Sequence, residues 1–297
     1  MRTKLFLIGA AAWLGLSACA TAPTQQPQPP VALLDAHTHM MVENISPDEE
    51  IARLKAAGVS RVLLMHTEPE VIAAMARKYP DFVIPSLSVA RPTVKGVHLD
   101  KDTGPLMARL RAERAICGFG EVPAASIGDP DSLRGVYAAA ASTGAPLNMH
   151  IDLAKPEAVA AVEAAATANP KMHLVLAHLG WTAGPELIGG LLDAHPNLYT
   201  DVSIRFDAPG SLPWRNNGVD LSVLAADGSI PPAWRAVITR HPDRFLFAMD
   251  INSFGPRYTM MSELVMVARK ALAPLPRPVQ EAIAHGNAER LLAGCGR

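Results

Sequence analysis

The sequence has few cysteines, few aromatic residues and no excess of charge of either sign. Its 297 residues include 3 Cys, 5% aromatic residues and a formal net charge of −1. This balance gives no argument for a basic surface, so nucleic acid is not an expected partner. The hydrophobic content of 49% suffices for one large core, as one barrel-sized domain or as two smaller ones.

The apolar run near the N-terminus is too short for a membrane span. It extends over residues 5–16, whereas a spanning helix needs about 20 apolar residues. Arg2 and Lys4 precede the run, and a basic segment followed by a short apolar one is typical of a secretory signal. We therefore expect residues 1–18 to be a signal peptide outside the fold.

The end of this segment, Leu16-Ser17-Ala18-Cys19, resembles the lipobox of bacterial lipoproteins. The resemblance implies cleavage before Cys19 and lipidation of that cysteine, which anchors the protein to a membrane of the cell envelope. Ala20 follows rather than Asp, which implies the outer membrane, facing the periplasm. Residues 19–30 are rich in Pro and Gln and are expected to form an extended tether. The alternative is an ordinary cleaved signal with an incidental cysteine.

Two further cysteines, Cys117 and Cys295, lie in the remaining chain. An export route is oxidising, which permits disulfides. However, Cys117 lies in a predicted buried strand and Cys295 in the C-terminal tail. We therefore expect two free thiols.

From residue 31 onward, short apolar runs alternate with Ala/Leu-rich helical patterns. The candidate strands are Ala32–His39, Arg61–His66, Phe82–Val89, Ala115–Val122, Pro146–Ile151, His173–Leu179, Leu198–Ser203 and Arg244–Ile251. Strands alternating with helices predict βαβ units and a parallel sheet, and eight units match a TIM (β/α)8 barrel over residues 31–297. A doubly wound open sheet is the alternative, but no Gly-x-Gly-x-x-Gly turn follows a strand.

One connection is much longer than the others. Residues 205–230, between the seventh and eighth strands, contain Pro, Gly, Asn and Asp with weak periodicity. Long loops in compact domains are usually functional, and this one follows the C-terminal end of a strand, where barrel active sites lie. We expect a loop over the site, with Trp214 as a candidate cover for substrate.

His37 and His39 are the first candidate metal ligands. Side chains two residues apart on a strand point to the same side, so both imidazoles face inward at the end of the first strand. Two neighbouring imidazoles suit zinc or a similar ion. Four other strand ends carry Glu121, His150, His178 and Asp250. Because buried charged groups need partners, a shared metal explains the whole set.

These motifs resemble those of the amidohydrolase superfamily, in its amidohydrolase-related branch. The matching pieces are Asp35–His39, Gly120-Glu121, His150, His178-Leu179-Gly180-Trp181, Asp250 and Gly286–Leu291. The resemblance implies that His37, His39 and Asp250 bind one metal. It implies that His150 and His178 bind a second metal, or that one of them acts as an acid–base group. Glu121 takes the place of a bridging ligand, and whether one or two ions bind stays open.

The expected reaction is hydrolysis of a C–N or C–O bond (amide, cyclic amide, lactone or ester) of a small molecule. A divalent ion, most plausibly zinc, lowers the pKa of water, and Asp250 transfers the proton. His178 is a second catalytic candidate, as an oxyanion stabiliser or proton shuttle. The alternatives are a metal-dependent decarboxylase, favoured by an arginine-lined pocket and a single metal, and a non-catalytic metal-binding lipoprotein.

Three further residues are candidate substrate contacts beside Trp214. His66 ends the second strand, and Trp181 follows the ligand of the sixth. Arg205 follows the seventh strand and offers a bidentate contact to a carboxylate or phosphate. Each has a structural alternative: a core histidine, packing under a loop, or a surface salt bridge.

Overall fold

A computed structural model describes residues 29–40, 45–89, 91–93, 96–99, 101–123, 130–210, 220–252 and 256–295. The chain divides into two units, Met1–Pro30 and Val31–Arg297, and the description concerns the second. The predicted signal peptide, Cys19 and almost all of the tether lie outside the described residues. Among the described helices, none combines the length and the apolar character needed to cross a membrane.

The second unit is a TIM barrel, as the sequence predicts. Eight parallel strands form one sheet in the order β1-β2-β3-β6-β7-β8-β9-β10. Their bounds are Leu34–His39 (β1), Arg61–His66 (β2), Val83–Leu87 (β3), Gly118–Pro123 (β6), Pro146–His150 (β7), His173–Leu176 (β8), Leu198–Asp201 (β9) and Phe245–Leu246 (β10). The strands are largely buried because the barrel interior covers one face and helices cover the other.

Backbone hydrogen bonds join the segment after β10 to β1. Ala36 donates to the Phe247 carbonyl at 3.0 Å, and His39 donates to the Ile251 carbonyl at 2.8 Å. The buried Asp35 carboxylate strengthens this seam by accepting the Met249 amide at 3.0 Å. Asp35 thus holds the first strand against the segment that carries Asp250.

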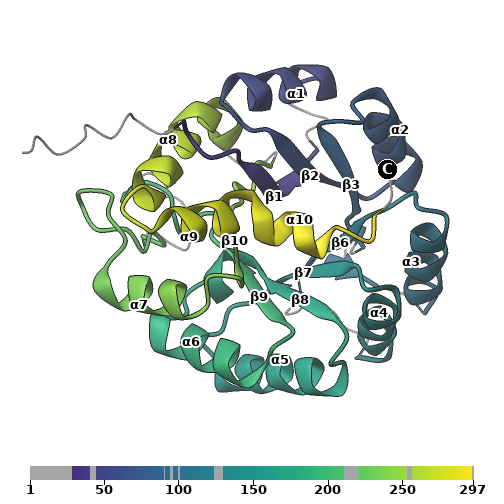
Figure 1. The fold of residues 1–297 in the computed structure, drawn as a ribbon. Helices are drawn as coiled ribbons and strands as arrows, with labels where there is room; N and C mark the ends of the chain where they lie inside the picture. The colour runs from purple at the N-terminus through teal and green to yellow at the C-terminus, as the bar shows by residue number, and fades with distance from the viewer. Residues whose placement is uncertain are drawn as a thin grey trace, which may run out of the picture. The chain divides into compact units, whose positions relative to one another are not determined.

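Helices surround the strands, as Figure 1 shows. Their bounds are Pro47–Ala56 (α1), Pro69–Lys78 (α2), Thr103–Ala112 (α3), Pro130–Thr143 (α4), Pro156–Ala168 (α5), Pro185–Ala194 (α6), Pro232–Arg240 (α7), Met261–Leu272 (α8), Arg277–Glu281 (α9) and Asn287–Leu291 (α10). Short 3-10 turns cover Ala177–Gly180 (η2) and Pro256–Thr259 (η4), and a π-helical turn covers Ala282–Gly286 (η5). The sequence explains why α1 starts at Pro47. Proline fits the first turn of a helix, and the Ser46 hydroxyl caps the helix by accepting the Glu49 amide at 3.2 Å.

Several elements are absent from the sequence-based prediction. A short antiparallel hairpin of Arg91–Thr93 (β4) and Gly96–His98 (β5) follows β3. No bounds were predicted for helices α3, α7 and α10, and the short helix α9 and the turn η5 were not predicted. Trp214 and its neighbours at 211–219 lie outside the described residues, so the expected covering loop stays a prediction.

The C-terminal segment lies across the N-terminal end of the barrel (Figure 1). Ala288, Leu291 and Leu292 pack with apolar side chains from the starts of several strands. The buried Asn287 amide donates to the Pro242 carbonyl at 2.9 Å and to the Phe245 carbonyl at 2.8 Å. This end of the barrel is therefore filled by apolar contacts and closed by the last helix.

The expectation of two free thiols is wrong, because Cys117 and Cys295 form a disulfide. Their Cα atoms lie 5.2 Å apart, although 178 positions separate them in the sequence. The physical reason is the docking of α10. Leu291 and Leu292 hold the end of the chain against the barrel, which carries Cys295 to the start of β6.

Candidate metal centre

Six polar side chains meet at the C-terminal ends of the strands. They come from β1, β6, β7, the turn after β8 and the segment after β10: His37, His39, Glu121, His150, His178 and Asp250. Their nitrogen and oxygen atoms form two overlapping groups, each able to hold a metal ion, and Glu121 belongs to both; a third such group joins His37 and His178 to Asp201. The structure thus brings together all six side chains that the sequence nominated as ligands.

The two β1 histidines turn the same ring nitrogen toward one point. His37 is fully buried and the His39 side chain is 26% exposed. Their Nε2 atoms lie 3.3 Å apart. Alternation along the strand produces this pairing, as the His-x-His spacing predicts.

Glu121 lies between two pairs of histidines. Its Oε2 is 3.4 Å from His39 Nε2 and 3.7 Å from His37 Nε2. Its Oε1 is 2.6 Å from His150 Nδ1 and 3.1 Å from His178 Nε2. Each carboxylate oxygen therefore faces one pair of imidazoles, which is the arrangement of a carboxylate that bridges two cations.

Gly120 allows Glu121 to take this place. Its φ is +119°, a conformation that side chains rarely adopt. A Cβ at this position would also collide with the backbone oxygen of Asn148 on β7. Only glycine fits, so the Gly120-Glu121 pair in the sequence has a steric cause.

Asp250, in the segment after β10, reaches the same group. Its Oδ1 lies 3.6 Å from His39 Nε2 and 3.8 Å from His37 Nε2. Its φ is +49°, a left-handed conformation. The fully buried Arg257 supports this turn by donating to the Asp250 carbonyl at 3.1 Å and by pairing with Asp207.

Asp201 at the end of β9 is a site residue that the sequence analysis missed. Its buried Oδ2 accepts His37 Nδ1–H at 3.0 Å and the Asn148 amide at 2.9 Å. Its Oδ1 accepts the backbone N–H of His178 at 3.0 Å and the Ser203 hydroxyl at 2.5 Å. The signal was present, since an acid ends the seventh strand just as Glu, His and Asp end its neighbours.

The contact with Asp201 determines which nitrogen of His37 can bind a cation. A carboxylate only accepts hydrogen bonds, so His37 carries its proton on Nδ1 when neutral. The Nε2 lone pair then faces His39, Glu121 and Asp250. This is the usual way in which a carboxylate orients a metal-binding histidine.

The electrostatics of the cluster favour added positive charge. Burial lowers the pKa of His37, but Glu121 and Asp201 outweigh burial and hold it well above its ordinary value. Burial opposes the charge of Glu121, yet His37 and the hydrogen bond from His150 hold its pKa well below the usual range. Buried carboxylates that stabilise a nearby cation this strongly, together with imidazole nitrogens, form a donor set that fits a divalent metal.

Trp181 forms an apolar wall beside the ligands. Its ring centroid lies 4.8 Å from that of His150 and 5.4 Å from that of His178. Trp181 also packs with Ile204 and Leu221, which come from the connection after β9. The side of the cluster next to His150 is therefore bordered by apolar surface.

Among the described residues, the other nominated side chains are not members of the metal-binding groups, and their expected contacts with substrate stay predictions. His66 at the end of β2 accepts the Glu68 amide at 3.1 Å, a local contact within its own turn. Arg205 is buried, donates to the Ala183 carbonyl at 3.2 Å and lies over the Trp234 ring. Burial lowers the pKa of Arg205 to about 10, against the effect of Asp152. Neither residue belongs to the metal-binding groups, and Trp214 and Cys19 lie outside the described residues.

Comparisons with known proteins agree with this geometry. A family model described as amidohydrolase matches residues 23–293. A search of curated proteins found no match.

Three solved structures illustrate the shared fold. An uncharacterised TIM-barrel protein from Bordetella bronchiseptica is 19% identical, covers 90% of this chain and 100% of its own, and has a TM-score of 0.61. A putative 2-pyrone-4,6-dicarboxylic acid hydrolase from Pseudomonas putida is 16% identical, covers 89% and 98%, and has a TM-score of 0.60. An amidohydrolase from Burkholderia multivorans with bound zinc is 18% identical, covers 88% and 99%, and has a TM-score of 0.56. At these identities the likeness shows a common barrel.

Proposed function

The chain belongs to the amidohydrolase family and is therefore a metal-dependent enzyme, and from that premise we propose that it hydrolyses a C–N or C–O bond of a small molecule. The observation that carries the proposal is the position of Glu121, with one carboxylate oxygen facing each pair of histidines. Amides, cyclic amides, lactones and esters are the substrate classes that such a site can serve.

We propose that two divalent cations, zinc ions, bind. His37, His39 and Asp250 would hold one cation, His150 and His178 the other, and Glu121 both. Imidazole nitrogens and carboxylate oxygens are ligands that zinc accepts readily. Decarboxylation, the main alternative, is favoured by a single metal in an arginine-lined pocket. The two faces of Glu121 support the two-cation hydrolase instead.

Asp250 is the proposed proton carrier. Bound cations supply a lowered pKa for the attacking water and polarisation of the scissile bond. Burial raises the pKa of Asp250, but His37 and His178 hold it below its ordinary value, so the side chain is an anion at neutral pH. It can therefore accept a proton from water and return it to the leaving group.

The surroundings of His178 favour a ligand role over a free proton shuttle. Its Nδ1 lies 2.7 Å from the Ser203 hydroxyl, and its Nε2 lies 3.1 Å from Glu121 Oε1. Both ring nitrogens thus have fixed partners. Trp181, on the same side, offers a flat apolar surface, which suits a substrate with a planar apolar group.

The test is metal analysis joined to an activity screen. We expect the purified protein to retain about two equivalents of metal, and His37→Ala/His39→Ala to lose at least one of them. A screen of lactones, esters, amides and dipeptides should then reveal turnover that disappears in the same variant. Wild-type protein that is fully folded and metal-free, or decarboxylation in place of hydrolysis, would overturn the proposal.

We also propose that the enzyme acts in the bacterial cell envelope, on a lipid anchor at Cys19 that faces the periplasm. The Cys117–Cys295 disulfide supports this place, because stable disulfides belong to oxidising compartments. Labelling of growing cells with a radioactive fatty acid should mark the wild-type protein and leave Cys19→Ser unlabelled. Equal labelling of both would exclude Cys19 as the anchor.

A further inference from the structure

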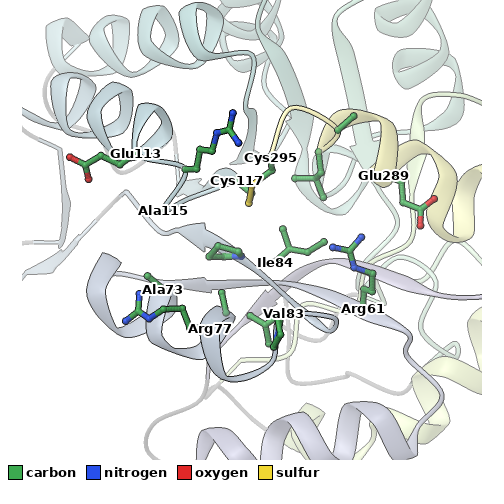
Figure 2. A pocket seen from close by; sticks show the side chains of 16 residues that line it. Arg61, Ala73, Arg77, Val83, Ile84, Glu113, Ala115, Cys117, Glu289 and Cys295 are labelled. Atoms are coloured by element: carbon green, nitrogen blue, oxygen red, sulfur yellow. A yellow bond between two sulfur atoms is a disulfide. The ribbon is translucent and has the colours of Figure 1, made fainter. Parts of the chain in front are cut away.

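A cavity of about 740 Å³ lies at the end of the barrel opposite the metal centre. It opens among the starts of β2, β3 and β6, the outer helix α2 and the C-terminal segment after α10. Figure 2 shows it, with Arg61, Arg77, Ile84, Cys117 and Cys295 among the lining side chains. We call it the arginine cavity. Its volume is that of a typical small-molecule site.

Three guanidinium groups line the arginine cavity, and each comes from a different element. Arg61 begins β2, Arg77 lies in the last turn of α2, and Arg114 lies in the turn before β6. Among the described residues, no carboxylate lies within ion-pair distance of any of these three groups. Three cations thus border one cavity without an anionic partner from the described part of the chain.

Two carboxylates, Glu113 and Glu289, also line the cavity, so its charged lining has three cations and two anions. On α10, Glu289 Oε2 lies 3.1 Å from Nδ1 of His285 on η5, outside the reach of an ion pair with the three arginines. Glu113 lies at the outer margin, and Figure 2 shows its carboxylate pointing away from Ile84 and Cys117. The cavity therefore presents a net positive rim.

The floor of the cavity is apolar. Val83, Ile84 and Leu292 line it and are nearly inaccessible to solvent. The disulfide fixes one wall, because Cys117 and Cys295 both line the cavity and join β6 to the end of the chain. A preformed apolar floor below a cationic rim suits a ligand that has an apolar body and an anionic head.

We propose that the arginine cavity is a second binding site, for an organic anion that carries a carboxylate or phosphate on an apolar chain. Guanidinium groups bind both anions through paired hydrogen bonds, and the apolar floor excludes water from the chain. The N-terminal end of a TIM barrel normally serves stability. A ligand-sized cavity with unpaired arginines at that end therefore indicates a separate function.

The test follows two isoleucine methyl groups by NMR in the metal-loaded protein. Ile84 lines the cavity, whereas Ile204 packs beside Trp181 at the metal centre. Titration with octanoate should shift the Ile84 signal in a saturable manner, and octanol should bind at least about 10-fold more weakly. Equal binding of octanol, or a response confined to Ile204, would overturn the proposal.

Arginine variants make the test specific. Arg61→Gln should weaken octanoate binding about 10-fold, and Arg114→Gln provides an independent variant if Arg61→Gln does not fold. Arg235→Gln is the matched control, since Arg235 lies exposed on α7 outside the cavity. Hydrolase activity should be unchanged in all three variants. Identical affinities in wild type, Arg61→Gln and Arg114→Gln would refute an anion site.

A second set of titrations distinguishes a soluble anion from the headgroup of a membrane lipid. Octyl phosphate represents a soluble ligand, and phosphatidylglycerol vesicles, compared with phosphatidylcholine vesicles, represent a membrane lipid. A response of Ile84 that depends on Arg61 in either case supports the site and identifies the source. No response to octanoate, octyl phosphate or phosphatidylglycerol would overturn it.

Discussion

The two ends of this barrel differ in how deeply their charged side chains are buried, although the same eight strands build both. At the C-terminal end, Glu121, Asp201 and Asp250 lie buried or nearly so among histidines. At the N-terminal end, apolar side chains fill the interior and the charged groups remain at the rim of the arginine cavity. Charged side chains are therefore largely buried at the C-terminal end and lie near solvent at the N-terminal end.

This difference shows which end does chemistry. Buried carboxylates are costly unless hydrogen bonds or cations compensate them, so their presence at one end requires a reason beyond folding. A bound metal supplies that reason. The N-terminal end carries no such cost and is closed by a disulfide and a docked helix, which stabilise the fold. Substitutions at the two ends should therefore change different properties.

The largest effect is expected from Asp250→Asn at the metal end. The amide keeps the size of the side chain but cannot accept a proton from water. We expect kcat to fall about 10³-fold, in the range typical of a lost general base, with little change in unfolding temperature. The measurement is steady-state kinetics on a substrate from the hydrolysis screen, beside thermal unfolding of the metal-loaded protein.

Asn252 offers a control at the same turn. Its amide donates to Asp250 Oδ1 at 3.0 Å, so Asn252→Ala perturbs the neighbourhood and leaves the carboxylate in place. We expect a much smaller loss of kcat in this variant. If Asp250→Asn retained wild-type turnover, Asp250 would not carry the proton, and the contrast between the two ends would lose its chemical basis.

An intermediate effect is expected from Cys117→Ser/Cys295→Ser at the opposite end. The disulfide closes a loop of 178 residues, so its loss frees the unfolded chain and destabilises the fold by about 2–4 kcal/mol. Denaturant unfolding measures this change. Activity at low temperature should persist because the metal ligands lie at the other end. A variant as stable as wild type but inactive would reverse the comparison.

The fold and the main ligands were predictable because both depend on local spacing. Alternating strands and helices predicted the barrel, and the strand Arg61–His66 has the bounds expected from the sequence. His37 and His39 share a face because strands alternate. The other nominated ligands meet them because parallel strands bring their C-terminal ends to one rim.

Features that depend on tertiary contacts were not predictable. Cys117 and Cys295 pair because α10 docks across the barrel, and nothing near either cysteine indicates that docking. Arg257 reaches Asp207 only through the turn after β10. Arg205 donates to the Ala183 carbonyl and lies over the Trp234 ring, and its place after the seventh strand does not indicate these contacts. Sequence spacing places side chains on a face, whereas pairings between distant elements follow from packing.

The smallest effect is expected from Asp201→Asn, and it tests whether metal affinity depends on the carboxylate that orients His37. Asp201 accepts His37 Nδ1–H, so its carboxylate keeps the Nε2 lone pair of His37 available. An asparagine that turns its NH2 toward His37 favours the other tautomer and removes that lone pair. We expect zinc affinity, measured by competition with a chelator, to fall about 10- to 100-fold.

Asp193→Asn is the matched control, because Asp193 also pairs with a histidine, at 2.9 Å from His241 Nε2, but on the outer helix α6. Equal zinc affinity in the two variants would restrict the metal centre to its direct ligands. A loss of zinc affinity in Asp201→Asn alone would show that metal binding also depends on a buried residue behind the direct ligands. The functional part of the barrel would then reach toward the apolar core that separates it from the arginine cavity.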